Sequence, residues 1–509
     1  MENIRKKVIS ITHISLILSL FTLFAYHYPL FKLVVNNVEG GFNSVIIVGG
    51  LAVIMLTLNF MIYNLLLFLG RIVGRIIISL SLIANAVTLY FINSYDVLIT
   101  DSMMGNVFNT RFSEASGFFS LTALLYVLFL GILPSILLLL PKIDYKGAKL
   151  CLKHTGISLL VTLCGVIINI QNFTWVDRNA TQLGSLLMPW SYTVNTIRYY
   201  NFERKRNRKE ILLPDAKLKN SNREVAVLII GESARSANFS LYGYERETNP
   251  LLKGDSVVAL RAKASATYTT AGVKAILDHK ATDKLYEILP NYLFRNGVDV
   301  RWRSTNWGEP PVHITHYLNI DSLRARYPNS DSNYDAILLE GLKEEIIQSD
   351  KEKILIILHS STSHGPTYFK KYPSEFEQFK PVCTTVEMAD ADLKELVNAY
   401  DNTILYTDYL LHSTIEMLRQ IPERRSSMIY VSDHGESLGE NNLYMHGVPM
   451  ALAPKEQIEI PFIVWSSDGR ENIKAMEEVG HYHVFHSILN FLSIESPIYD
   501  EQMNIFESR

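Results

Sequence analysis

A run of six apolar residues ends in a polar turn at Val225-Ala-Val-Leu-Ile-Ile230-Gly-Glu-Ser-Ala-Arg235. The run is short, uninterrupted and rich in branched side chains, which predicts a buried β-strand. The same order recurs at Met428-Ile-Tyr-Val-Ser432, which leads into Asp433-His434-Gly435, and at 354–359, which leads into Ser363-His364. Several strands of one sheet are therefore expected to end in carboxylates and imidazoles.

The wider pattern of the second half predicts an α/β sandwich around a mostly parallel sheet. Further apolar runs of strand length lie at 298–302 and 460–465, and longer mixed segments at 285–296, 334–348 and 393–420 predict the helices. Strands that alternate with helices form such sandwiches, and their ligands bind at the carboxyl ends of the strands. The polar motifs lie where that rule places an active site.

Nearly all long apolar runs of the 509-residue chain fall before residue 171. Five of them, at 9–27, 45–69, 76–92, 118–140 and 150–170, are long enough to cross about 30 Å of hydrocarbon as helices. They lack the polar face of a helix in a soluble core, and later apolar segments argue against a cleaved signal peptide. We expect a five-helix transmembrane bundle over 1–171, an amphipathic connector over 172–214 and a catalytic domain over 215–509.

Basic residues in short loops indicate how the chain is oriented in the membrane. They gather before the first span, between the second and third, and between the fourth and fifth: Arg5, Lys6, Lys7, Arg71, Arg75, Lys142, Lys146 and Lys149. This pattern places the N-terminus in the cytoplasm. Five spans then place the catalytic domain on the far side of a bacterial inner membrane, in the periplasm.

Charge and cysteine content narrow the class of protein. A formal charge of −3 at pH 7 gives no reason to expect a nucleic-acid partner. Cys151 and Cys164 lie in an apolar segment and Cys383 is alone in the catalytic domain, so that domain cannot form an internal disulfide. In the connector, Trp175, Trp190 and the basic stretch 204–209 suit a segment that lies along lipid head groups, and a plain linker is the alternative.

Glu232, Asp433 and His434 are the predicted metal ligands. A single Glu after a strand is more often an acid in the first turn of a helix, but an Asp-His pair at a second strand end is a much rarer coincidence. Zn²⁺ binds carboxylate oxygen and imidazole nitrogen in a tetrahedron, and its catalytic sites keep one position open. The residue types therefore predict a Zn²⁺ site.

The open position calls for a nucleophile. The segment Ser265-Ala-Thr267-Tyr-Thr269-Thr270-Ala-Gly272 offers hydroxyls ahead of a helix that we expect to begin near Val273. A hydroxyl bound to a cation loses its proton readily, and a helix N-terminus can hold a phosphoryl oxygen. Simple capping of the helix is the alternative role for any one of these hydroxyls. The pattern leaves both Thr269 and Thr270 open as the nucleophile.

His364 and His446 are the remaining candidates in the catalytic domain. Near a metal they would bind the phosphoryl group, hold a second cation or protonate the leaving alcohol. In the membrane part, Asn106, Thr110 and Glu114 are spaced so that on a helix they share one face. A solvated polar face is the plain alternative for these three, and a binding site for a cationic head group is the functional one.

At these residues the chain resembles the membrane-bound phosphoethanolamine transferases, a family that includes lipid A modifying enzymes and mobile colistin-resistance proteins. The matching stretches are 231–250 (Gly231-Glu-Ser-Ala-Arg to Thr248-Asn-Pro250), Ser363-His-Gly-Pro-Thr-Tyr368, 400–409 and Ser432-Asp-His-Gly-Glu-Ser-Leu-Gly-Glu-Asn441. The resemblance covers nearly the whole length. It implies five spans followed by a domain of the alkaline phosphatase and sulfatase superfamily.

The resemblance also implies roles for individual residues. Zn²⁺ ligation falls to Glu232, Asp433 and His434, and Thr269, preferred over Thr270, becomes the nucleophile that also touches the metal. His364 and His446 become phosphate-side histidines, and Asn106, Thr110 and Glu114 become head-group residues. The implied reaction moves phosphoethanolamine from phosphatidylethanolamine to lipid A or another envelope glycan through a covalent threonine intermediate, which would favour polymyxin resistance.

The chain departs from the family pattern in two places. Ser265 and Ala275 stand where relatives carry a cysteine pair, and Cys383 lacks its partner, so we expect packing to brace the nucleophile loop. The loop that begins at Asn306 lacks a lysine found in many relatives.

Three other functions remain to be separated from the implied one: a phosphoglycerol transferase of the lipoteichoic acid type, phosphoethanolamine transfer to a non-lipid-A acceptor, and a scaffold without catalysis. A sulfatase is disfavoured because its nucleophile motif is missing.

Overall fold

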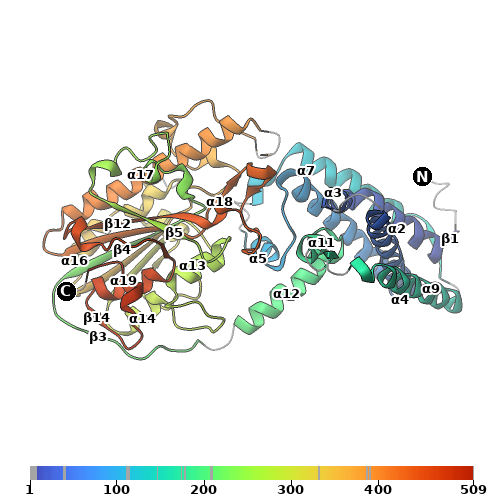
Figure 1. The fold of residues 1–509 in the computed structure, drawn as a ribbon, viewed down its shortest axis with the longest axis horizontal. Coiled ribbons are helices and arrows are strands. Elements are labelled where there is room, and N and C mark those ends of the chain that lie inside the picture. Colours follow the sequence, from blue (N-terminus) through green and yellow to red (C-terminus); the bar gives the residue numbers. More distant parts are fainter. Residues whose placement is uncertain are drawn as a thin grey trace. The chain divides into compact units, whose positions relative to one another are not determined.

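The structure is a computed structural model that describes residues 8–37, 42–110, 115–145, 147–172, 175–176, 179–206, 210–330, 333–385, 388 and 391–507. The chain forms two compact units, Met1–Asn201 and Phe202–Arg509 (Figure 1). Each unit is described below by itself.

Long apolar helices build the first unit. The predicted first span is α2 (Ile11–Tyr26), which bends by 57° into α3 (Tyr28–Asn37). Helix α4 (Phe42–Tyr95) has 54 residues, more than twice the ~20 that one span needs. It breaks at Arg71, whose φ of 43° and ψ of −110° are not helical. Helix α4 therefore supplies both the second and the third expected spans.

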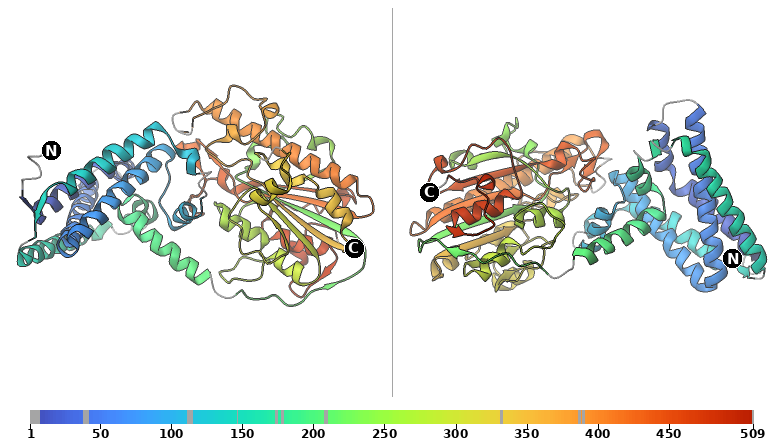
Figure 2. Two further views of the ribbon diagram at one scale, coloured as in Figure 1. Left: turned by 180° about the vertical axis from the view of Figure 1, so that it is seen from behind. Right: turned by 60° about the horizontal axis from the view of Figure 1, so that its bottom comes forward.

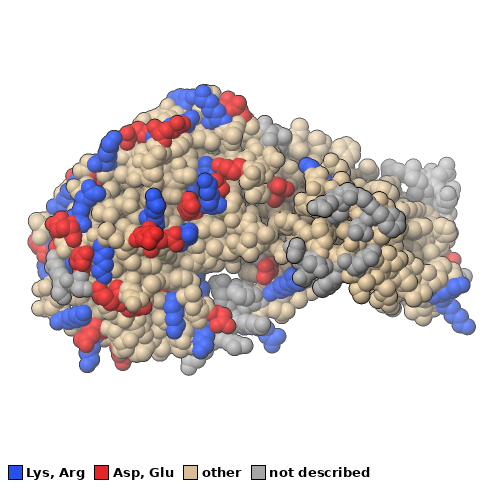
Figure 3. All heavy atoms as spheres, in the orientation of Figure 1, with Lys and Arg blue, Asp and Glu red and all other residues tan. Residues whose placement is uncertain are grey.

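The last two expected spans are also present. The fourth is a continuous stack of α7 (Leu121–Tyr126), the π-helical η2 (Val127–Ile132) and α8 (Leu133–Leu139), and the fifth is α9 (Ala148–Ile168). On the face that Figure 3 shows, charged side chains crowd the second unit and are sparse over these helices. The five-helix transmembrane bundle is thereby confirmed.

The connector packs on the bundle through its tryptophans. Helices α11 (Ala180–Leu186) and α12 (Trp190–Arg206) follow α9. The Trp190 Nε1–H donates to Asn59 Oδ1 at 3.0 Å, and the Trp175 Nε1–H donates to the Asn37 carbonyl at 3.3 Å. Both indole N–H groups thus bind the helix bundle, and contact of this segment with lipid head groups stays a prediction.

An eight-stranded sheet forms the middle layer of the second unit. Its order is β13 (Val479–Gly480), β5 (Val258–Lys263), β12 (Glu459–Ser466), β9 (Arg425–Ser432), β4 (Glu224–Gly231), β8 (Lys353–His359), β6 (Asp299–Ser304) and β7 (His316–Leu318). Strands β9, β4, β8, β6 and β7 run parallel, and β12 is antiparallel to both of its neighbours. The mostly parallel sheet is as predicted.

Helices cover both faces of this sheet, so the unit is an α/β sandwich (Figures 1 and 2). Helix α17 (Leu393–Arg419) covers one face, and α13 (Thr269–Leu277), α14 (Leu289–Arg295) and α19 (His483–Phe491) cover the other. Alternate residues of β4 point to opposite faces, and Ala226, Leu228 and Ile230 join the core beneath α13 and α19. The sandwich places the carboxyl ends of β4, β8, β9 and β6 at one edge.

Two of the expected helices differ in extent. The segment 334–348 is split into the 3-10 helix η7 (Asp335–Leu339) and α16 (Leu342–Gln348), because Gly341 has a φ of 63°. The segment 285–296 becomes helical only at Leu289, where Pro290 occupies the first turn. Neither change moves the edge of the sheet that carries the motifs.

Candidate metal and nucleophile site

The pairing of two central strands places Glu232 beside Asp433. Strands β4 and β9 are parallel neighbours in which Gly231 pairs with Ser432, so the next residue of each strand emerges at the same level. The chain turns sharply at Ser233, whose φ is 52°. The Ser233 N–H donates to Asp433 Oδ1 at 3.1 Å, which fixes that carboxylate against the turn. Glu232 and Asp433 are each at most 1% exposed.

His434 directs a nitrogen at both carboxylates. Its Nε2 lies 3.4 Å from Glu232 Oε1 and 3.3 Å from Asp433 Oδ2. Its Nδ1 lies 2.9 Å from the Gly435 carbonyl oxygen, a contact that requires the proton on Nδ1. The Nε2 lone pair then faces two carboxylate oxygens, and Asp433 Oδ2 is buried without a hydrogen-bond partner. Three electron-pair donors that converge in a buried space fit a cation.

Thr269 completes this group. Its Oγ1 lies 3.3 Å from Glu232 Oε2 and 3.4 Å from His434 Nε2. Thr269 is buried, whereas the Thr270 side chain is half-buried. Helix α13 begins at Thr269, four residues earlier than expected. The expectation of a start near Val273 is therefore wrong, since Tyr268 already has the extended backbone of an N-cap residue, with φ −152° and ψ 152°.

Close packing holds helix α13 against the predicted metal ligands. An added Cβ at Gly272 would lie 2.4 Å from the Asp433 carbonyl oxygen, so only glycine fits at this crossing. The Thr267 hydroxyl donates to the Val448 carbonyl at 2.7 Å, and the Ser265 N–H donates to His481 Nδ1 at 3.3 Å. Packing and these hydrogen bonds hold the nucleophile loop, and the three cysteines are free.

The loop after β6 supports Glu232 from the other side. The Asn306 amide donates to Glu232 Oε2 at 2.8 Å and to the Ser360 carbonyl at 2.9 Å. Gly308 has a φ of 91°, and an added Cβ there would lie 3.3 Å from both Thr269 Cγ2 and Thr270 Cγ2. Asn306 follows its strand as Glu232 and Asp433 follow theirs, so the strand-end rule could have identified it.

A buried ion pair fixes this loop to the sheet. His359, the last residue of β8, is fully buried, and its Nδ1 lies 3.1 Å from Glu309 Oε1. The Ser304 hydroxyl also donates to Glu309 Oε1. Burial raises the pKa of Glu309, but hydrogen bonding with His359 outweighs it and leaves that pKa below its ordinary value. Burial lowers the pKa of His359, but Glu309 outweighs that effect and raises it.

The two predicted phosphate-side histidines lie next to this group. The ring centroid of His446 is 4.2 Å from that of His434 and 5.6 Å from that of His364. Ligand atoms of Glu232, His434 and His446 lie within 4.8 Å of one another. His446 Nδ1 lies 2.7 Å from Glu436 Oε2, and Glu436 also accepts from the Tyr368 hydroxyl. Glu436 lies three residues after Asp433 in the same motif, yet only the fold shows that it contacts His446.

The electrostatics of the site favour a bound cation. Burial raises the pKa of Glu232, but His434 and the other imidazoles outweigh it and hold that pKa well below its ordinary value. Burial and then the charge of Glu232 raise the pKa of Asp433. Burial also lowers the pKa of His446 to about 3 and raises that of Glu436 to about 7. A divalent cation would offset the repulsion between two adjacent buried carboxylates.

The three residues predicted in the membrane part lie at the end of a short helix. Helix α5 (Asp101–Asn109) contains Asn106, but Thr110 follows the helix with a ψ of 128°. The Thr110 N–H and hydroxyl both donate to the Asn106 carbonyl, at 2.8 and 2.7 Å, and so end the helix there. The common helical face therefore does not reach Thr110, and Glu114 lies outside the described residues. Their role in head-group binding stays a prediction.

Comparison with known proteins identifies the family. Over 96% of its length, the chain is 35% identical to phosphoethanolamine transferase EptA of Helicobacter pylori, and the match covers 95% of that protein. The chain belongs to the phosphoethanolamine transferase family. Residues 54–203 match the model of phosphoethanolamine transferase EptA/EptB, and residues 224–494 match that of sulfatase. The catalytic domain is thus of the alkaline phosphatase superfamily.

Two other members of the family support this assignment. Phosphatidylethanolamine transferase Mcr-1 of Escherichia coli is 31% identical over 78% of this chain and 79% of its own. The integral membrane protein lipooligosaccharide phosphoethanolamine transferase A (EptA) of Neisseria meningitidis has a TM-score of 0.89 at 27% identity, over 98% of this chain and 99% of its own. The chain is therefore a transferase anchored in the inner membrane, with a soluble periplasmic catalytic domain.

Proposed function

We propose that this transferase moves phosphoethanolamine from phosphatidylethanolamine to lipid A or another envelope glycan, with Thr269 as the nucleophile. The observation that carries the proposal is the position of Thr269 Oγ1, within 3.4 Å of both Glu232 and His434. The names of Mcr-1 and of the Neisseria enzyme support phosphatidylethanolamine as donor and a lipid-linked glycan as acceptor. Further support comes from an E. coli relative, 24% identical over 81% of this chain, that is named a Kdo(2)-lipid A phosphoethanolamine 7''-transferase.

We further propose that Glu232, Thr269, Asp433 and His434 hold Zn²⁺. Two carboxylates, a hydroxyl and an imidazole nitrogen with a free lone pair match the donors that Zn²⁺ prefers. When bound there, Zn²⁺ would lower the pKa of the threonine hydroxyl and offset charge on the phosphoryl oxygens. The orphaned Asp433 Oδ2 is the atom that most needs such a partner.

The side chains of the site divide the two steps between them. Thr269 Oγ1 attacks phosphorus and the bond to the diacylglycerol oxygen breaks, while Glu232 accepts the hydrogen bond of the attacking hydroxyl and orients it. The first turn of α13 offers backbone N–H groups to a phosphoryl oxygen. His364 and His446 lie beside this group, and one of them passes the hydroxyl proton to the leaving alcohol. An acceptor oxygen then attacks phosphorus and releases Thr269.

Replacing the nucleophile tests the reaction directly. We expect Thr269→Ala to lower transfer from phosphatidylethanolamine to lipid A by about 10³-fold or more, because the substitution removes the oxygen on which the proposed covalent intermediate forms. Thr270→Ala is the matched control and keeps most of the activity. Mass spectrometry follows both the lipid A product and the phosphoethanolamine adduct on the protein. Full activity of Thr269→Ala would contradict the proposal, and an adduct on Thr270 would move the assignment there.

A further inference from the structure

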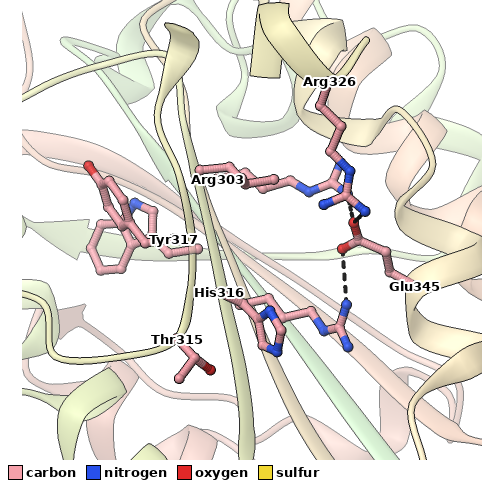
Figure 4. A pocket seen from close by; sticks show the side chains of 9 residues that line it. Arg303, Thr315, His316, Tyr317, Arg326 and Glu345 are labelled. Carbon is pink, nitrogen blue, oxygen red and sulfur yellow. Dashed lines mark hydrogen bonds and ion pairs between the residues drawn. The ribbon is translucent and has the colours of Figure 1, made fainter. Parts of the chain in front are cut away.

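A second, separate cavity of about 220 Å³ lies at the edge of the sheet, beside β6 and β7. Its lining includes Arg301, Arg303, His316, Tyr317, Arg326 and Glu345 (Figure 4). Arg301 and Arg303 are two residues apart on β6 and therefore project to the same face of the sheet. Arg326 ends α15 (Ile320–Arg326), and Glu345 lies on α16. None of these residues belongs to the metal and nucleophile site.

Positive charge dominates this cavity. Glu345 accepts a hydrogen bond from Arg301 at 3.1 Å and forms ion pairs with Arg303 at 3.0 Å and Arg326 at 2.7 Å. Asp299, 3.0 Å from Arg301, is the second carboxylate in contact with them. Arginine stays protonated at all ordinary pH values. Among the described residues, two carboxylates therefore leave one positive charge of the three uncompensated, in a recess with room for several water molecules.

Arg303 carries a donor with no acceptor. Its side chain is 1% exposed, its terminal nitrogens donate to the carbonyls of Leu338 and Glu340, and it forms an ion pair with Glu345. Its Nε is buried and has no hydrogen-bond partner. A buried donor on a charged group that lacks a partner is costly, and Arg303 lines the cavity. An anion in the cavity would supply the missing acceptor.

We propose that this cavity binds a phosphate-type oxyanion, either free phosphate or the phosphate of a phosphomonoester. Guanidinium groups present paired N–H donors whose spacing matches the oxygens of phosphate. Arg326 is half exposed and stands where an anion would enter from solvent. His316 is also exposed and adds a further donor from β7, the strand next to β6. This proposal does not depend on the transfer reaction proposed above.

Arg326 and Arg324 form a matched pair for the test. Both lie in the last turn of α15 and are 50% and 48% exposed, but only Arg326 lines the cavity. Purified full-length protein is titrated with inorganic phosphate and with glucosamine 1-phosphate, against chloride at equal ionic strength. Calorimetric affinity and thermal unfolding are recorded for the wild type, Arg326→Ala and Arg324→Ala. Because the metal site is identical in all three proteins, only the cavity distinguishes them.

We expect phosphate to raise the unfolding temperature of the wild type and of Arg324→Ala, while Arg326→Ala binds about tenfold more weakly or worse, as loss of one charge-assisted hydrogen bond predicts. Tighter binding of glucosamine 1-phosphate identifies a phosphomonoester as the ligand, and equal or weaker binding identifies free phosphate. Equal affinities of Arg326→Ala and the wild type, or no effect of phosphate beyond chloride, would overturn the proposal and leave the arginines a purely structural role.

Discussion

At the scale of single residues, the contacts that hold Glu232 in place are as informative as its proposed role as a metal ligand. Asn306 holds Glu232, and the loop that carries Asn306 is fixed in turn by the buried pair of Glu309 and His359. This loop, residues 305–315, contains no cysteine and no lysine. We infer that this ion pair braces the loop and so holds Asn306 against Glu232.

The first prediction concerns the pH dependence of this pair. Because the pKa of Glu309 is lowered in the folded protein, its contribution to folding stability is complete above its ordinary pKa of 4.5. That contribution is lost as the pH falls through the lower folded value. Because the pKa of His359 is raised in the folded protein, its contribution to folding stability is complete below its ordinary pKa of 6.5. That contribution is lost as the pH rises through the higher folded value. The coupling energy between the two residues should therefore be largest between pH 4.5 and 6.5 and smaller at alkaline pH.

A double-mutant cycle measures that coupling. Urea unfolding of the wild type, Glu309→Gln, His359→Asn and the double variant should give a coupling free energy of about 1–3 kcal/mol near pH 6. We expect a clearly smaller value near pH 9. Arg324→Ala, which changes an exposed side chain outside this pair, controls for general effects of pH on the protein. A coupling that is zero at both pH values would show that the pair does not brace the loop.

At the scale of elements, the position of α13 decides whether the site is assembled. Gly272 lets the helix approach the Asp433 carbonyl so closely that a methyl group does not fit. We predict that Gly272→Ala destabilises the catalytic domain by about 1–3 kcal/mol through overpacking. The same change displaces Thr269 from Glu232, and a misplacement near 1 Å lowers transfer about 10²-fold.

Gly254→Ala is the control for this substitution, because an added Cβ at Gly254 meets nothing within 4 Å. Its stability and activity should stay near those of the wild type. Lipid A mass spectrometry and thermal unfolding provide both readouts. If Gly272→Ala proved fully active and equally stable, the close contact between α13 and the Asp433 turn would not exist in solution.

The sequence predicts the interior elements well and the edges poorly. Strands β4, β8, β9 and β12 contain continuous apolar runs and are buried almost throughout, so their pattern is unmistakable. In contrast, β5 (VALRAK) alternates between buried and exposed residues, and β7 has only three residues, so neither produces a run. Helix α19 has only 9 residues, and His483 and His486 interrupt its apolar residues, so the sequence does not predict it.

The same limit applies to the site. Glu232, Asp433 and His434 follow strands directly, so strand position alone places them together. The contacts of Glu436 with His446 and of Glu309 with His359 join segments that lie 10 and 50 residues apart. Such contacts depend on the register of the sheet and the paths of the loops, which no local pattern encodes.

At the scale of the whole molecule, the two units divide the work of the enzyme. The membrane unit supplies the spans, while Glu232, Thr269, Asp433 and His434 all lie in the second unit, Phe202–Arg509. That unit also has its own complete sheet and its own hydrophobic core. Metal binding should therefore belong to the second unit alone, and use of a donor lipid should require both units.

A fragment of residues 210–509 tests this division. It keeps the bridge between Ile211 and Tyr286 and the core position of Leu213, so we predict a soluble domain that unfolds cooperatively. Its Zn²⁺ affinity should match that of the full chain within about twofold, because every ligand is present. Saturating Zn²⁺ at about 100 times Kd should stabilise both proteins by about 2.7 kcal/mol over chelator-treated samples.

Phosphatidylethanolamine in vesicles should be consumed by the full chain alone. A fragment that folds but binds Zn²⁺ far more weakly would mean that the membrane unit takes part in the metal site.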